Sequence, residues 1–149
     1  MPTRDYSLRC LPTIQQPPSG ETEEEHQQTL SLMEWVGYDF SYMFKYSERP
    51  GTLAARKYKD DVPEETKSRR LHEVIELQMK LSLTSKQQDM GQTFEVLAEG
   101  ISKKSEDHLY GRSSQNKVVV FPKALLSPGE YTHVKVTGCT SATLIGHPV

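Results

Sequence analysis

The stretch HLYGRSSQNKVVVF, residues 108–121, holds two short runs that favour β-strands and a polar turn between them. The runs are His108–Arg112 and Lys117–Phe121, and the turn is Ser-Ser-Gln-Asn at 113–116. β-Branched and aromatic residues bounded by polar clusters are typical of strands. The stretch therefore predicts a hairpin.

Similar runs lie on both sides of this hairpin. They are Thr93–Glu99, Tyr131–Thr137 and Ala142–His147, separated by turns at 100–104, 127–129 and 138–141. Five short strands at such spacing are typical of a Greek-key or OB-like barrel. We predict a small five-stranded antiparallel OB-like β-barrel over residues 91–149.

A helix is expected to begin near Thr22, because Thr22 and Glu25 match a capping box, and to end at Gly37. A strand with one buried face should follow, because aromatic residues alternate with others there. The alternating aromatics are Tyr38, Phe40, Tyr42 and Phe44.

A long helix is predicted over residues 62–89, with Pro63 in its first turn and Gly91 as its stop. Its basic residues Lys67, Arg69, Arg70 and Lys80 are interpreted as a solvated face. One strand between two helices cannot form a sheet, so residues 21–90 are expected to belong to a larger α/β domain. Pairing of that strand with the barrel stays open as the alternative. The fold class is α+β.

Charge and cysteine content limit the function. Eighteen basic and twenty acidic residues give a net charge of −2, so an RNA-binding surface would have to be a local cluster. Cys10 and Cys139 are the only cysteines and stand in no ligand motif, so the sequence offers no metal or catalytic set. No apolar run approaches the roughly 18 residues of a membrane span, and we expect a cytoplasmic protein.

Several motifs resemble those of the MiaB-type radical S-adenosylmethionine tRNA methylthiotransferases. The similarity runs from Gly20 to Val149, and FKYSERPGT at 44–52 is its most specific part. The other matching stretches are GETEEE at 20–25, RRL at 69–71, LQ at 77–78, SED at 105–107 leading to Arg112, QNKVVVF at 115–121 and SATL at 141–144.

The resemblance implies a three-part enzyme that methylthiolates an isopentenylated adenosine beside the anticodon. Such an enzyme uses S-adenosylmethionine and two [4Fe-4S] clusters, each held by three cysteines. This chain has none of those cysteines, so no cofactor is expected on it. Residues 21–90 would be the distal part of the radical barrel, and residues 91–149 a TRAM domain that binds the anticodon stem-loop of tRNA.

We therefore expect a monomeric carboxyl-terminal fragment that is inactive alone. A stand-alone TRAM-type RNA-binding protein and a nonfunctional remnant are the alternatives. Residues 1–20 depart from the family pattern and are interpreted as an irregular lead left by a frame shift, a gene-boundary error or a rearrangement. This departure puts in doubt any cofactor role for Glu21.

The candidate RNA-binding residues surround the first two barrel turns. Lysine and arginine supply phosphate contacts, Tyr110 would stack on a base or ribose, and Asn116 with Gln115 would read a base edge or shape the turn. The interpretation as ordinary surface charge stays open. A loop with Ser47 and Arg49 is a second candidate, on the substrate side or as a structural connector. The barrel set is Lys103, Lys104, Tyr110, Arg112, Asn116 and Lys117.

Overall fold

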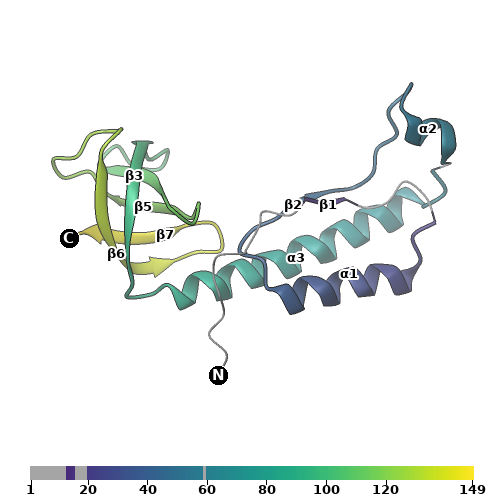
Figure 1. Ribbon diagram of the computed structural model, residues 1–149, viewed down its shortest axis with the longest axis horizontal. Coiled ribbons are helices and arrows are strands. Elements are labelled where there is room, and N and C mark those ends of the chain that lie inside the picture. Colours follow the sequence, from purple (N-terminus) through teal and green to yellow (C-terminus); the bar gives the residue numbers. More distant parts are fainter. Residues whose placement is uncertain (1–12, 16–19, 59) are drawn as a thin grey trace. The chain divides into compact units, whose positions relative to one another are not determined.

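The computed structural model describes residues 13–15, 20–58 and 60–149, and it divides into two compact units, residues 1–81 and 82–149 (Figure 1). The predicted mixed α+β class is confirmed. The first unit holds β1 (Thr13–Gln15), α1 (Glu23–Val36), β2 (Tyr42–Phe44), α2 (Leu53–Lys57) and most of α3 (Glu64–Gln88). The second holds β3 (Thr93–Ile101), β4 (His108–Ser113), β5 (Val118–Pro122), β6 (Tyr131–Cys139) and β7 (Leu144–Pro148).

Helix α1 has the caps that the sequence predicts. The Thr22 hydroxyl accepts from the Glu25 backbone N–H at 3.2 Å, and the Glu25 carboxylate accepts from the Thr22 N–H at 2.8 Å. Gly37 closes the helix at φ 65°, in the left-handed region that glycine enters without a Cβ clash. Local chemistry therefore fixes both ends of this helix.

The first unit contains a β–α–β motif, with β1 and β2 parallel and Ile14 opposite Met43. Strand β1 lies inside the stretch predicted as an irregular lead, and that prediction is wrong for residues 13–15. The rest of the lead, residues 1–12 and 16–19, falls outside the described residues. The open alternative, that the predicted strand pairs with the barrel, is not observed in the described chain, since β2 pairs with β1.

The aromatic face predicted as buried is exposed. Strand β2 is only three residues long, and Phe40, Tyr42 and Phe44 are 43%, 51% and 53% exposed. Their neighbour Ser41 is buried instead, and its hydroxyl donates to the Gln78 carboxamide at 2.8 Å. The alternation predicted from the sequence is therefore present, but the Ser41 side chain faces α3 and the aromatic rings face away from that helix.

Helix α3 confirms the predicted long helix, but two of its cations are not solvated. Lys67 and Arg70 are 5% and 4% exposed, so the interpretation of a solvated basic face is wrong for them. Lys67 pairs with Asp60, and the Arg70 guanidinium lies 2.8 Å from the Glu21 carboxylate. Buried charges need such partners, and periodicity does not reveal a partner far away in sequence.

The second unit is a closed barrel with strand order β3-β4-β5-β7-β6. All neighbouring pairs are antiparallel except β5 and β7, which are parallel with Val119 opposite Leu144. The predicted five-stranded OB-like barrel is confirmed, with this correction to its all-antiparallel description. The predicted strand limits agree with the structure to within two residues.

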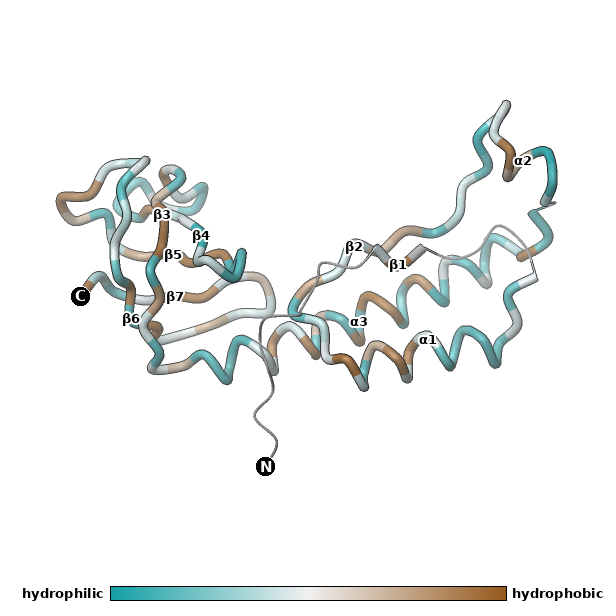
Figure 2. The backbone as a smooth tube through the Cα atoms, in the orientation of Figure 1, coloured by the Kyte–Doolittle hydropathy of each residue, from teal (hydrophilic) through white to brown (hydrophobic). Residues whose placement is uncertain are grey.

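Alternation fills the barrel interior with aliphatic side chains and one ring. Figure 2 shows the hydrophobic stretches of β3 and β5. Gly111 is required where β4 pairs with β3, because a Cβ there would lie 2.2 Å from the Leu97 carbonyl oxygen. The fully buried core comprises Val96, Ala98, Leu109, Val119, Phe121, Val134, Val136 and Leu144.

The second compact unit begins at Ser82, earlier than the boundary at residue 91 predicted from the sequence. The turn after α3 is bonded into the barrel, since the Gly91 N–H donates to the Val136 carbonyl at 3.0 Å and the Val136 N–H to the Gln92 carbonyl at 2.8 Å. The last turns of α3 therefore form part of the barrel unit.

Candidate nucleic-acid interface

The outer surface of β4 carries the predicted stacking residue, Tyr110. Tyr110 lies opposite Gly100 on β3 and opposite Val120 on β5. A Cβ at Gly100 would lie 3.0 Å from Cε1 of the Tyr110 ring, so the ring lies across a strand that offers no side chain at that position. Tyr110 and Val120 are half-buried, which leaves part of a flat apolar surface open to a planar ligand.

Lys103 and Lys104 lie in the turn between β3 and β4, two residues beyond the strand pair Ile101 and Leu109. Both side chains are exposed, and neither ammonium has an ion-pair partner among the described residues. Glu106 and Asp107 follow in the same turn, so its net charge is zero. The two lysines can therefore contact and neutralise a phosphate, although the neighbouring carboxylates of Glu106 and Asp107 would repel it.

Arg112 lies at the far end of β4 on the face that carries Tyr110, because residues two apart on a strand share a face. Its guanidinium donates to the Asn116 side-chain oxygen at 2.8 Å, and its Nε lies 3.4 Å from the Glu99 carboxylate. Asn116 has φ 60°, which supports the alternative that it shapes the turn. Gln115 is exposed beside it.

Lys117, the sixth predicted residue, is not on the surface. Its side chain is 5% exposed, and its Nζ lies 2.5 Å from the Asp89 carboxylate, which is 7% exposed. A lysine buried in an ion pair is not available to a phosphate, so Lys117 is excluded from the candidate interface. Periodicity places Lys117 at the start of a strand, but it gives no sign of Asp89, twenty-eight residues earlier.

The second predicted site, Ser47 and Arg49, belongs to the first unit. Both residues are exposed in the segment between β2 and α2. The Arg49 carbonyl accepts from the Thr52 hydroxyl at 2.8 Å, and the Thr52 hydroxyl in turn caps α2 at Ala55. The Arg49 backbone thus has a structural role, while its guanidinium has no acidic partner among the described residues.

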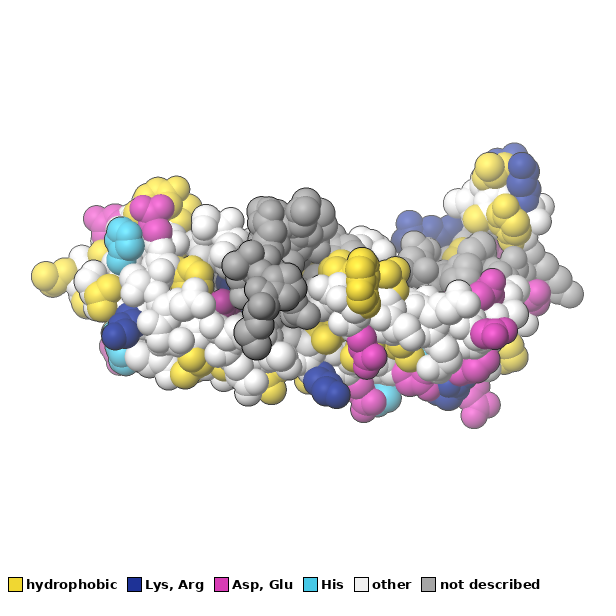
Figure 3. Space-filling model, turned by 60° about the horizontal axis from the view of Figure 1, so that its bottom comes forward, with side chains coloured by type: hydrophobic (Ala, Val, Ile, Leu, Met, Phe, Trp, Pro, Cys, Tyr) yellow, Lys and Arg dark blue, Asp and Glu magenta, His cyan; other side chains and the backbone are white. Residues whose placement is uncertain are grey.

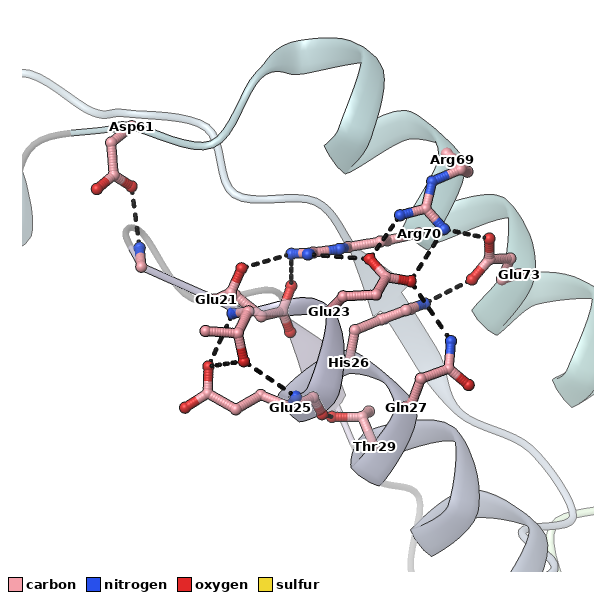
Figure 4. A network of polar contacts seen from close by, with 12 residues as sticks. Glu21, Glu23, Glu25, His26, Gln27, Thr29, Asp61, Arg69, Arg70 and Glu73 are labelled. Atoms are coloured by element: carbon pink, nitrogen blue, oxygen red, sulfur yellow. Dashed lines mark hydrogen bonds and ion pairs between the residues drawn. The ribbon is translucent and has the colours of Figure 1, made fainter.

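Glu21, the residue whose cofactor role was in doubt, is part of a polar network between the starts of α1 and α3 (Figure 4). Arg70 donates to both the carboxylate and the carbonyl of Glu21, at 2.8 and 2.9 Å. Arg69 bridges Glu23 and Glu73 at 2.7 and 2.6 Å. The network joins two helices. Among the described residues, the partner of the Glu21 carboxylate within it is Arg70.

Two carboxyl groups that bond across the two helices, those of Glu23 and Glu73, have lowered pKa values. The hydrogen bond from Arg69 lowers the pKa of Glu23 to about 2. The hydrogen bond with the buried His26, followed by that of Arg69, lowers the pKa of Glu73. Both shifts come mainly from hydrogen bonds between α1 and α3, as expected of a structural network.

The residues present do not fit an iron–sulfur cluster. Such a cluster needs three cysteine thiolates, whereas the chain has Cys10, outside the described residues, and Cys139, half-buried in β6. Across 13–15, 20–58 and 60–149, no group of three His, Cys, Asp or Glu side chains could hold a metal ion. In the same residues, no helix has the length and apolarity to cross a membrane.

A closed five-stranded barrel with exposed cations around a half-buried tyrosine is typical of small RNA-binding domains. The family model of the TRAM domain matches residues 87–149, and the predicted TRAM domain is thereby confirmed.

Curated relatives define the wider family. The chain is 56% identical over 129 residues to the tRNA-2-methylthio-N(6)-dimethylallyladenosine synthases of Phocaeicola vulgatus and Flavobacterium johnsoniae. The enzyme of that name from Christiangramia forsetii is 57% identical. Each match covers 87% of this chain but only 27–28% of the relative. The resemblance to the MiaB-type family is confirmed: the chain matches the carboxyl-terminal part of these synthases.

Proposed function

We propose that this chain binds the anticodon stem-loop of tRNA through the outer surface of β3 and β4. In this role it supplies tRNA binding for methylthiolation of an isopentenylated adenosine next to the anticodon. The observation that carries the proposal is the order of groups along one hairpin. Lys103 and Lys104 lie at the turn, Tyr110 lies over Gly100, and Arg112 lies one residue before the end of β4.

Each group in this row matches a feature of single-stranded RNA. Lysine and arginine contact phosphates, and this contact supplies salt-dependent affinity without sequence preference. An aromatic ring stacks on an unpaired base, at about 1–3 kcal/mol per base. The opposing charges of Glu99, Glu106 and Asp107 reduce the net attraction, so we expect weak binding by this stretch alone.

The catalytic step would require groups that this stretch does not supply. The chain spans 28% of the Phocaeicola vulgatus relative and lacks the cysteines for a cluster. We propose that it is inactive alone and acts in the cytoplasm as part of a larger synthase. The exposed aromatic face of Phe40, Tyr42 and Phe44 favours this over a stand-alone RNA-binding protein, because a free protein seldom leaves three large apolar side chains together in water.

The test is equilibrium binding of a fluorescent anticodon stem-loop to the full chain across a salt series. Lys103→Gln/Lys104→Gln should weaken binding and lower the slope of log affinity against log salt by roughly 0.7–0.9 per lost contact. Lys80→Gln/Lys135→Gln changes the net charge equally, at α3 and on the outside of β6, and should leave the slope unchanged. Equal slopes for the two double variants would refute the proposed interface.

A further inference from the structure

A short basic segment of the first unit has no role in the function proposed above. We define the basic arm as residues 49–58, which contain Arg49, Arg56 and Lys57 and no acidic residue, a local charge of +3. Its helix, α2, has no buried residue. Figure 1 shows α2 standing away from α1 and α3.

The charges of the basic arm are unpaired, unlike those beside it. Among the described residues, no carboxylate pairs with Arg49, Arg56 or Lys57, and the Arg56 guanidinium donates to the Gly51 carbonyl at 2.9 Å. Outside the arm, ion pairs occupy the cations Lys45, Lys67, Arg69 and Arg70, whose partners are Glu64, Asp60, Glu23 and Glu21. Among the described residues of the first unit, these three cations without a carboxylate partner therefore lie together on one projection.

Stability of the arm does not account for this composition. Arg56 and Lys57 lie in the last turn of α2, where cations favour the helix dipole by about 0.3–1 kcal/mol each. A five-residue helix is far below the length of roughly 12 residues at which helices become stable alone. In the same arm, the side chains of Leu53 and Tyr58 are 62% and 51% exposed. A segment that only stabilised the fold would be expected to bury such large side chains.

Cations interleaved with an exposed aromatic residue are the composition of a nucleic-acid-binding surface. Figure 3 shows Lys and Arg side chains gathered with hydrophobic ones on the projecting segment. We infer that the basic arm is a second RNA-binding element, in which Arg56 and Lys57 contact phosphates of the bound tRNA and Tyr58 packs against a base or ribose. The inference rests on the proposed tRNA binding and extends it to a separate part of the chain.

The experiment uses the full chain and the same fluorescent anticodon stem-loop. Arg56→Gln/Lys57→Gln should lower affinity by about tenfold at 0.1 M salt and reduce the salt slope by roughly 1.4–1.8, the value for two lost phosphate contacts. The charge-preserving exchange Arg56→Lys/Lys57→Arg should retain the affinity. The circular dichroism spectrum should be unchanged, because neither altered side chain is buried.

The controls separate this inference from the proposed function. Lys80→Gln/Lys135→Gln again provides the matched change in net charge. If the arm variant binds like this control while Lys103→Gln/Lys104→Gln binds more weakly, the inference is overturned and the barrel interface stands. If only the arm variant binds more weakly, the barrel interface fails and the arm remains. An arm variant with normal RNA binding that no longer sediments with phosphatidylserine vesicles would overturn the inference in favour of a lipid partner.

Discussion

The ammonium nitrogen of Lys117 lies 2.5 Å from a carboxylate oxygen of Asp89, and both side chains are buried within the barrel unit. Asp89 follows α3, and Lys117 comes just before β5, so the pair ties the end of the helix to the hairpin of the candidate interface. Removing one partner of a buried pair leaves an uncompensated charge, which costs about 3–5 kcal/mol.

Lys117→Met should therefore lower the free energy of unfolding of the barrel by about 3–5 kcal/mol. Lys117→Met combined with Asp89→Leu should recover most of this loss, because no charge is then left buried. Urea unfolding of the full chain, followed through barrel amide signals, gives both values. A single variant as stable as the wild type would show that Asp89 is solvated without Lys117.

Fragment stability should depend on the same contact. A fragment of residues 82–149 should fold, whereas one of residues 92–149 should be marginal, because it loses Asp89 and the Gly91–Val136 hydrogen bond. Small barrels bury only roughly 60% of the surface that the unfolded chain exposes, so their free energy of unfolding is small. Amide dispersion in NMR spectra distinguishes the two. Equal thermal midpoints for the fragments would contradict the role given to the end of α3.

Two glycines in the barrel should respond very differently to alanine. Gly111→Ala should destabilise by about 3 kcal/mol or more, because its Cβ would meet the Leu97 carbonyl oxygen at 2.2 Å and backbone cannot move aside cheaply. Gly138→Ala places its Cβ at an ordinary 3.6 Å from Ile145 and should cost less than about 1 kcal/mol. Thermal unfolding of both variants tests the close approach of Gly111 to the β3 backbone, and similar melting temperatures would refute it.

The sequence predicted the features that local chemistry controls. The capping box of Thr22 and Glu25, the stop at Gly37 and the alternation in the barrel strands depend on neighbours within a few residues. Contacts distant in sequence were missed. In the sequence, Lys117 and Arg70 have the pattern of surface cations, and only the structure shows that they pair with Asp89 and Glu21. Phe40 has the pattern of a core residue, and only the structure shows that Ser41 faces α3 instead. Helix α2 was missed because it is short and follows a Pro-Gly turn, although Thr52 is a recognisable N-cap.

The network at the start of α1 should be acid-sensitive. Glu23 has its pKa lowered to about 2, first by the hydrogen bond from Arg69. A depressed carboxyl pKa stabilises the fold above the ordinary value of 4.5, and this contribution is lost as the pH falls toward 2. In Arg69→Gln, the pKa of Glu23 should rise toward its ordinary 4.5, as followed by NMR of the side-chain carboxyl carbon. An unchanged titration would assign the shift to another group.

The central claim is that the outer surface of β3 and β4 binds the anticodon stem-loop. Its most direct test is an NMR titration of the isotopically labelled full chain with that RNA at low salt. The account predicts that amide shifts concentrate at residues 100–112 and at Asn116, and that the Tyr110 ring signals move with them. Shifts confined to the outer surfaces of β6 and β7, with residues 100–116 unchanged, would contradict the account.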